Sequence, residues 1–237
     1  PLEEFRGQGK AGAYGEFMIE TDHHLGRILK WLDDEKLADN TMVIFTSDNG
    51  PETTWRERIQ RFGHHSNGIY RDGKRSVYEG GHRVPFIIRW PAQVKAGSQW
   101  DRPVCQTDLL ATFADMTDQR LPASAGEDSI SFNRVLRGVG ENSVAPRVAM
   151  VHHGSQGRFA LREQNWKLVM EDARRGKREL YDLAKDPGET TNVIAQHPEV
   201  AARLVAKLTV IVRNGRSSPG PVQKNDTPPW KELIWMR

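Results

Sequence analysis

A carboxylate and a carboxamide stand side by side at the end of an apolar run, in the stretch VIFTSDNGP. Asp48 and Asn49 are oxygen donors, and adjacent oxygen donors suit a hard cation such as Ca²⁺ or Mg²⁺. They suit zinc less well, because zinc favours His and Cys ligands. Two donors do not complete a metal site, so further ligands must come from elsewhere. Asp-Asn-Gly is also a common turn tripeptide, and a simple turn is the alternative interpretation of these letters.

A lysine follows downstream, in the stretch SNGIYRDGKRSVYEGGHRVPFIIRWP. Lys74, if fixed near a divalent cation, could neutralise a phosphoryl or sulfuryl group or a leaving oxygen. The pair Gly80-Gly81 permits a tight turn back towards such a site. His64 and His65 are candidate acid–base or substrate contacts. For the lysine and both histidines, a solvated loop side chain is the alternative.

The elements that must position these residues follow from the apolar spacing. Residues 12–37 carry apolar side chains at intervals of three, four and seven, which predicts one long helix. The continuous apolar run at 41–47 predicts a strand covered on both faces, as in a parallel sheet. Ligands of parallel α/β sheets bind beyond the carboxyl ends of the strands, where Asp48 and Asn49 would lie.

The rest of the sequence predicts a series of loops, short strands and helices. Residues 51–76 are polar and predict a long surface loop, 83–91 predict a strand, and 107–116 predict a short helix capped by Thr107 or Asp108. Residues 117–146 read mostly as loop. Four short strand-like runs between 147 and 183 predict an antiparallel meander, and 197–215 predict a helix that ends at Gly215. We therefore expect two domains, 1–143 and 144–237.

Composition excludes some classes of function. The chain has 237 residues and a net charge of +3, too small an excess to indicate a nucleic-acid partner. No apolar run approaches the roughly 18 residues that a membrane helix needs. A single cysteine, Cys105, permits no internal disulfide.

Taken in order, these stretches resemble the sulfatase family of the alkaline phosphatase-like superfamily. The stretch ETDHHLGRILKWLDDEKLADNTMVIFTSDNGP is similar to the helix and strand that end in the family's metal-binding Asp-Asn. The Gly-Lys followed by YEGGHRVP is similar to its lysine motif, and ELYDLAKDPGETTNV to its C-terminal subdomain. The resemblance implies part of a mixed or parallel-sheet α/β domain, followed by a small α+β subdomain with an antiparallel sheet and a C-terminal helix.

The resemblance also implies roles for particular residues. Asp48 and Asn49 would ligate Ca²⁺, with Mg²⁺ the less favoured ion, and Lys74 would contact the sulfate group of the substrate. His64, His65 and Arg71 fall in the family's variable loop, where they are candidate substrate contacts. The substrate would be a sulfated small molecule or carbohydrate. Members of the family are often exported, to the periplasm, the medium or the lysosome.

One part of the family's pattern is missing. The nucleophile of sulfatases is a formylglycine made from Cys or Ser in a Cys/Ser-x-Pro/Ala-x-Arg motif. Cys105, in PVCQTDL, does not match that motif, and no serine lies in it in a suitable context. The chain thus resembles the C-terminal half of a sulfatase, and we expect the nucleophile-bearing N-terminal half of the same protein as its partner. Without that half, we expect the chain to be inactive.

Two other functions fit the same residues. Phosphodiesterases and phosphonate monoester hydrolases of the same superfamily share the Asp-Asn and lysine motifs. A remnant that binds anionic ligands without catalysis is the third hypothesis.

Overall fold

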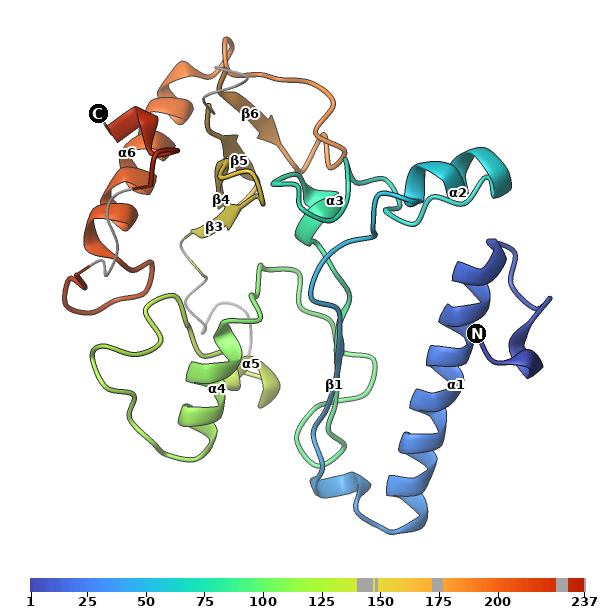
Figure 1. The fold of residues 1–237 in the computed structure, drawn as a ribbon. Helices are drawn as coiled ribbons and strands as arrows, with labels where there is room; N and C mark the ends of the chain where they lie inside the picture. The colour runs from blue at the N-terminus through green and yellow to red at the C-terminus, as the bar shows by residue number, and fades with distance from the viewer. Residues whose placement is uncertain (140–146, 148, 172–176, 225–229, 237) are drawn as a thin grey trace. The chain divides into compact units, whose positions relative to one another are not determined.

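The computed structural model describes residues 1–139, 147, 149–171, 177–224 and 230–236 (Figure 1). The chain divides into two compact units: one joins Pro1–Lys74 to Tyr78–Ser98, and the other joins Arg75–Val77 to Gln99–Arg237. The predicted domain boundary between residues 143 and 144 lies outside the described residues. In the part of the chain that is described, no helix has both the length and the apolar character needed to cross a membrane.

The first unit contains one long helix, several short ones and a pair of strands. In chain order its elements are η1 (Glu3–Phe5), α1 (Gly12–Asp34), η2 (Ala38–Asn40), β1 (Val43–Thr46), α2 (Trp55–Phe62), α3 (Glu79–His82) and β2 (Phe86–Arg89). Helix α1 confirms the long helix predicted from the apolar spacing. Strands β1 and β2 confirm the two strands predicted from the runs at 41–47 and 83–91.

A stripe of large apolar side chains on α1 is exposed. Phe17, Ile28 and Trp31 have exposed fractions of 55%, 54% and 56%. At about 100° per residue, the three positions fall within roughly 60° of one another around the helix. Clustered apolar side chains of this kind are typical of a helix face that packs against another element. Among the described residues of this unit, nothing covers the stripe.

Strand β1 pairs with β2 in an antiparallel register that matches Val43 with Arg89 and Thr46 with Phe86. All four residues of β1 are half-buried. The parallel neighbour suggested by the continuous apolar run is therefore not what the described residues provide. An apolar run indicates that both faces of a strand are covered. It does not indicate whether the neighbouring strand is parallel or antiparallel.

Helix α2 corrects the prediction of an uninterrupted loop over residues 51–76. Its apolar residues Trp55, Ile59 and Phe62 follow the spacing of a helix face. The helix ends at Gly63, which has a left-handed backbone (φ 64°) and donates its N–H to the carbonyl of Ile59. The high charge of WRERIQRF concealed this short pattern.

The second unit is built around an antiparallel sheet (Figure 1). Its elements are α4 (Asp108–Met116), α5 (Asn133–Leu136), β3 (Met150–His153), β4 (Phe159–Glu163), β5 (Trp166–Val169), β6 (Glu179–Asp182), α6 (Pro198–Asn214) and η4 (Ile234–Met236). The strands lie in the order β3-β4-β5-β6. This arrangement confirms the predicted meander, and α6 confirms the helix predicted to end at Gly215. Apart from the four-residue helix α5, the described residues 117–139 are loop, as predicted.

The core of the second unit is a row of apolar residues across the sheet. Leu161 of β4 faces Leu168 of β5, which in turn faces Leu180 of β6, and all three are fully buried. Leu204 and Leu208 of α6 join the same cluster. Their spacing of four residues places both on one face of α6, so the helix covers this side of the sheet.

A charged cluster also fastens α6 to the sheet. Glu163, at the end of β4, accepts hydrogen bonds from Arg203 and Lys207, which are four residues apart on α6. Burial alone would raise the pKa of Glu163, but the hydrogen bonds from Lys207 and Arg203 outweigh it and hold the pKa below its usual value. The carboxylate is therefore better stabilised in the folded than in the unfolded protein.

This lowered pKa predicts a stability contribution that depends on pH. The contribution is present above the unfolded pKa of about 4.3 and is lost as pH falls through the lower folded pKa. Because Arg203 is half exposed, we expect Glu163→Gln to cost only about 1 kcal/mol at pH 7. Urea unfolding at pH 7 and pH 3 should show this difference shrinking at the lower pH. Glu199→Gln, which removes an exposed carboxylate of α6, should change little, and an equal loss at both pH values for Glu163→Gln would contradict the prediction.

Candidate metal and anion site

The candidate metal ligands lie in the turn that follows β1. Asp48 is exposed and Asn49 is half-buried. The hydroxyl of Ser47 donates to the carbonyl of Asn49 (3.0 Å), and the Asn49 Nδ2 donates to the carbonyl of Gly50 (3.2 Å). With Nδ2 engaged in this way, the side chain of Asn49 keeps its amide oxygen as an acceptor.

Close backbone contacts join this turn to the Glu-Gly-Gly turn. The N–H of Gly50 donates to the carbonyl of Gly81 (2.9 Å), and a Cβ added to Gly50 would lie 1.8 Å from the oxygen of Gly80. Gly80 is equally confined, because its N–H donates to the carbonyl of Arg71 and its own Cβ would lie 2.3 Å from the oxygen of Asp72. Only glycine fits at these two positions, because the neighbouring backbone leaves no room for a Cβ.

The segment that carries the lysine is held by the same kind of contact. The N–H of Lys74 donates to the carbonyl of Pro51 (2.9 Å). A Cβ on Gly73 would lie 2.5 Å from that carbonyl oxygen and 2.7 Å from Nε1 of Trp55. We call Gly50, Gly73 and Gly80 the glycine clamp. The clamp fixes the backbone of Lys74 relative to the turn that bears the candidate metal ligands.

The side chain of Lys74 is partly exposed and has an acidic neighbour. Its Nζ lies 3.8 Å from Oε2 of Glu52. Oε1 of the same carboxylate accepts the N–H of Thr53 (2.8 Å). Glu52 has no motif of its own in the sequence, and its position directly after the Asp-Asn-Gly-Pro turn is the one local signal that points to it.

The side chains of the other candidate substrate residues are not part of the glycine clamp. The Arg71 carbonyl takes part in the clamp, while its guanidinium lies over the ring of Tyr78, 3.6 Å from the ring centroid. His64 and His65 are exposed beyond the end of α2, and the ring of His64 lies 6.0 Å from that of Tyr14. Their roles as substrate contacts stay predictions.

Glu79, at the start of the Glu-Gly-Gly turn, is completely buried. Its carboxylate oxygens lie 3.8 Å from Nε2 of His82 and 3.5 Å from Nη1 of Arg83. These contacts join the carboxylate to His82, the last residue of α3, and to Arg83, which follows it. Glu79 thereby anchors the turn that supplies Gly80 to the clamp.

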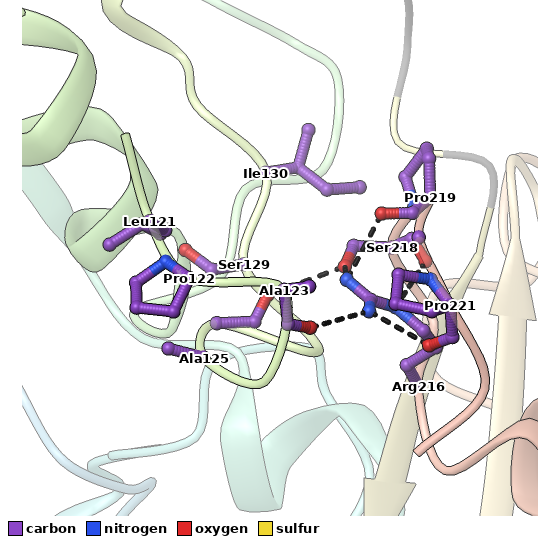
Figure 2. A pocket seen from close by; sticks show the side chains of 12 residues that line it. Leu121, Pro122, Ala123, Ala125, Ser129, Ile130, Arg216, Ser218, Pro219 and Pro221 are labelled. Atoms are coloured by element: carbon purple, nitrogen blue, oxygen red, sulfur yellow. Dashed lines mark hydrogen bonds between the residues drawn. The ribbon is translucent and has the colours of Figure 1, made fainter. Parts of the chain in front are cut away.

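The second unit has a separate pocket of about 280 Å³, drawn in Figure 2. Arg216 is its charged residue, but the guanidinium is fully occupied. Its nitrogens donate to the carbonyls of Ala123, Ser218, Pro219 and Pro221 and to the Ser218 hydroxyl. These five hydrogen bonds use all five N–H groups of an arginine. Arg216 therefore ties two loops together and offers no donor to an anion in this pocket.

Two family models match the chain. The one described as Sulfatase matches residues 3–119, and the one described as N-sulphoglucosamine sulphohydrolase, C-terminal, matches residues 67–214. The chain belongs to the sulfatase family, as its ordered motifs predicted.

Individual relatives agree with this assignment. The N-acetylgalactosamine-6-O-sulfatase of Bacteroides thetaiotaomicron is 37% identical over 221 residues, which cover 86% of this chain and 42% of that protein. A solved structure from work on glycosaminoglycan metabolism by the same species has a TM-score of 0.79 and 35% identity, covering 89% of this chain and 47% of its own. The phosphonate monoester hydrolase of Agrobacterium radiobacter has a TM-score of 0.63 and 25% identity, covering 84% and 40%. The chain thus spans less than half the length of each, and the shared α/β fold is the one predicted.

The letters of the nucleophile motif do occur once, in Ser143-Val144-Ala145-Pro146-Arg147. Of these five residues the structure describes Arg147. Its buried guanidinium donates to the carboxylate of Asp108, at the start of α4, and to the carbonyl of Asp128. This arginine is engaged in packing the second unit, and we assign no nucleophile to the segment.

Proposed function

We propose that this chain supplies the cation-binding and sulfate-binding residues of a sulfuric ester hydrolase that acts on a sulfated carbohydrate. The observation that carries the proposal is the glycine clamp. It holds the backbone of Lys74 against the turn of Asp48 and Asn49, so that a cationic side chain and two oxygen donors share one backbone frame.

The donor set fits a hard cation. Asp48 offers a carboxylate and Asn49 an amide oxygen, the ligand types that Ca²⁺ takes in proteins, with Mg²⁺ the second choice. A bound cation would stabilise negative charge on the sulfuryl oxygens. The exposed carboxylate and the half-buried amide leave room for further ligands, which a site for Ca²⁺ requires.

Lys74 would bind and orient the sulfate group. Its backbone is fixed by the hydrogen bond to Pro51, while its partly exposed side chain can reach an anion from solvent. An ammonium group held in this way adds a second positive charge to the site without a second metal ion.

The nucleophile would come from the rest of the protein. Two observations support a further segment of the sulfatase domain: the chain spans 42% of its N-acetylgalactosamine-6-O-sulfatase relative, and the stripe of Phe17, Ile28 and Trp31 on α1 is exposed. The formylglycine-bearing half would cover this stripe and complete the set of metal ligands. Peptide mapping by mass spectrometry of the protein from its native source tests this. A peptide with an oxidised Cys/Ser-x-Pro/Ala-x-Arg motif upstream of Pro1 is expected, and a native chain that begins at Pro1 and stands alone would refute it.

Removal of the Asp48 charge should weaken cation binding by the isolated chain. We expect Ca²⁺ to shift the amide resonances of Asp48 and Asn49 in an NMR titration, with weak affinity because the ligand set is incomplete. Asp48→Asn should abolish these shifts, since it removes the anionic ligand and keeps the shape. Asp22→Asn, an exposed position on α1, is the control and should bind as the wild type does. Unchanged Ca²⁺ shifts in Asp48→Asn would remove this residue from the site.

A phosphorus ester is the second candidate substrate, favoured by the structural likeness to a phosphonate monoester hydrolase. Paired assays of the whole protein with aryl sulfate and aryl phosphonate esters separate the two. Anion binding by the whole protein without turnover of either ester would favour the non-catalytic alternative.

A further inference from the structure

A carboxylate sits where it can influence any anion that approaches Lys74. Oε2 of Glu52 lies 3.8 Å from Lys74 Nζ, while Oε1 is held by the N–H of Thr53 at 2.8 Å. The two side chains have exposed fractions of 43% and 37%, so both groups remain in contact with solvent. An anion that binds the ammonium from solvent must therefore come within a few ångströms of a negative charge.

We propose that Glu52 is a charge-selectivity residue, which lowers the affinity of this site for doubly charged phosphate monoesters more than its affinity for singly charged sulfate esters. The inference rests on the proposed role of Lys74 as the anion-binding residue. It adds a reason why the site would accept one of two ester classes that have nearly the same tetrahedral shape.

The physical basis is the different charge of the two esters. A sulfate monoester carries one negative charge, whereas a phosphate monoester carries close to two at pH 8, above its second pKa of about 6. A lysine alone attracts the dianion more strongly. A neighbouring carboxylate repels each ligand in proportion to the ligand's charge. It therefore reduces the binding free energy of the dianion about twice as much as that of the monoanion.

The size of the effect follows from Coulomb's law. For a ligand charge about 6 Å from the carboxylate in a water-like dielectric, each unit of charge weakens binding roughly threefold. Removing the carboxylate charge should therefore strengthen binding of a sulfate ester about threefold and of a phosphate dianion about tenfold. Both gains should diminish in 1 M salt, where the Debye length is about 3 Å.

The variant Glu52→Gln isolates the charge. The amide oxygen of glutamine can still accept the N–H of Thr53, so the local turn is kept. Nearby Arg56 and Asp72 form their own ion pair at 2.8 Å, which is common to all variants. Glu57→Gln is the matched control, because Glu57 is an exposed carboxylate on α2 that pairs with Arg61 instead.

The test is an NMR titration of the 237-residue chain with phenyl sulfate and with phenyl phosphate, following the amide and side-chain resonances of Lys74. At pH 8 and low salt, Glu52→Gln should gain about threefold for the sulfate and about tenfold for the phosphate. At pH 5, where the phosphate ester carries one charge, both gains should be about threefold. Glu57→Gln should bind both esters as the wild type does.

The outcomes separate this inference from the proposed function. If Lys74→Ala loses binding but Glu52→Gln gains nothing, or gains equally for both esters at pH 8, the selectivity role is overturned and the lysine role stands. If Lys74→Ala binds as the wild type does, the anion-binding role fails, and the inference fails with it. Lack of any response to either ester in the wild type and in Glu52→Gln would overturn both.

Discussion

Replacement of Gly50 by alanine is expected to destabilise the first unit by more than about 3 kcal/mol. The new methyl group would lie 1.8 Å from the carbonyl oxygen of Gly80, which is backbone and cannot rotate away. Overpacking normally costs about 1–3 kcal/mol when side chains can adjust, so a clash with fixed backbone lies at or beyond the upper end of that range. Relief of the clash would also break the hydrogen bond from Gly50 to Gly81.

Chemical denaturation followed by circular dichroism measures this loss, and a neighbouring helix supplies the control. A Cβ added to Gly26, in the middle of α1, meets no atom within 4 Å. Gly26→Ala should therefore stabilise the protein by about 0.5–1 kcal/mol through helix propensity. If Gly50→Ala were tolerated as well as Gly26→Ala, the close approach of the two turns would be wrong.

The second large effect is expected at a buried ion pair in the second unit. Lys167 of β5 and Glu189 are both completely buried, with Nζ 2.9 Å from Oε1. Lys167→Met would leave a buried carboxylate without its countercharge, which typically costs 3–5 kcal/mol. We expect a loss of that order in the free energy of unfolding.

A double-mutant cycle distinguishes a lost pair from a simple packing defect. Adding Glu189→Gln to Lys167→Met removes the stranded charge, so the double variant should be more stable than Lys167→Met alone. Lys185→Met is the matched control, because that lysine is 86% exposed and its loss should cost well under 1 kcal/mol. Additive effects of the two buried substitutions would show that their charges are not coupled.

The sequence predicts the framework of this chain better than its charged interior. Helix α1, the meander and α6 follow from apolar periodicity, because each buries one face over several turns or strands. Helix α2 has only three apolar residues among charged ones, and so short a periodicity does not distinguish a helix from a loop. Lys167 occupies a strand position that any alternating pattern assigns to solvent, and only the fold reveals that Glu189 meets it there.

The candidate site, like the rest of the chain, can be predicted only in part from the sequence. Motif residues next to glycines could be identified, since glycine marks backbone contacts that no other residue allows. The antiparallel pairing of β1 and the approach of Glu52 to Lys74 depend on how separate segments are brought together. Neither has a local signature in the letters of the sequence.

The glycine clamp has a consequence for how this site can be re-engineered. Both ends of the segment that carries α2 are held by backbone hydrogen bonds, Lys74 to Pro51 and Gly80 to Arg71. Between those anchors the chain can change its side chains, and even its length, at little entropic cost. We therefore expect that exchange of the exposed side chains between Glu52 and Tyr70 can alter ester preference while the cation ligands and the lysine keep their backbone positions.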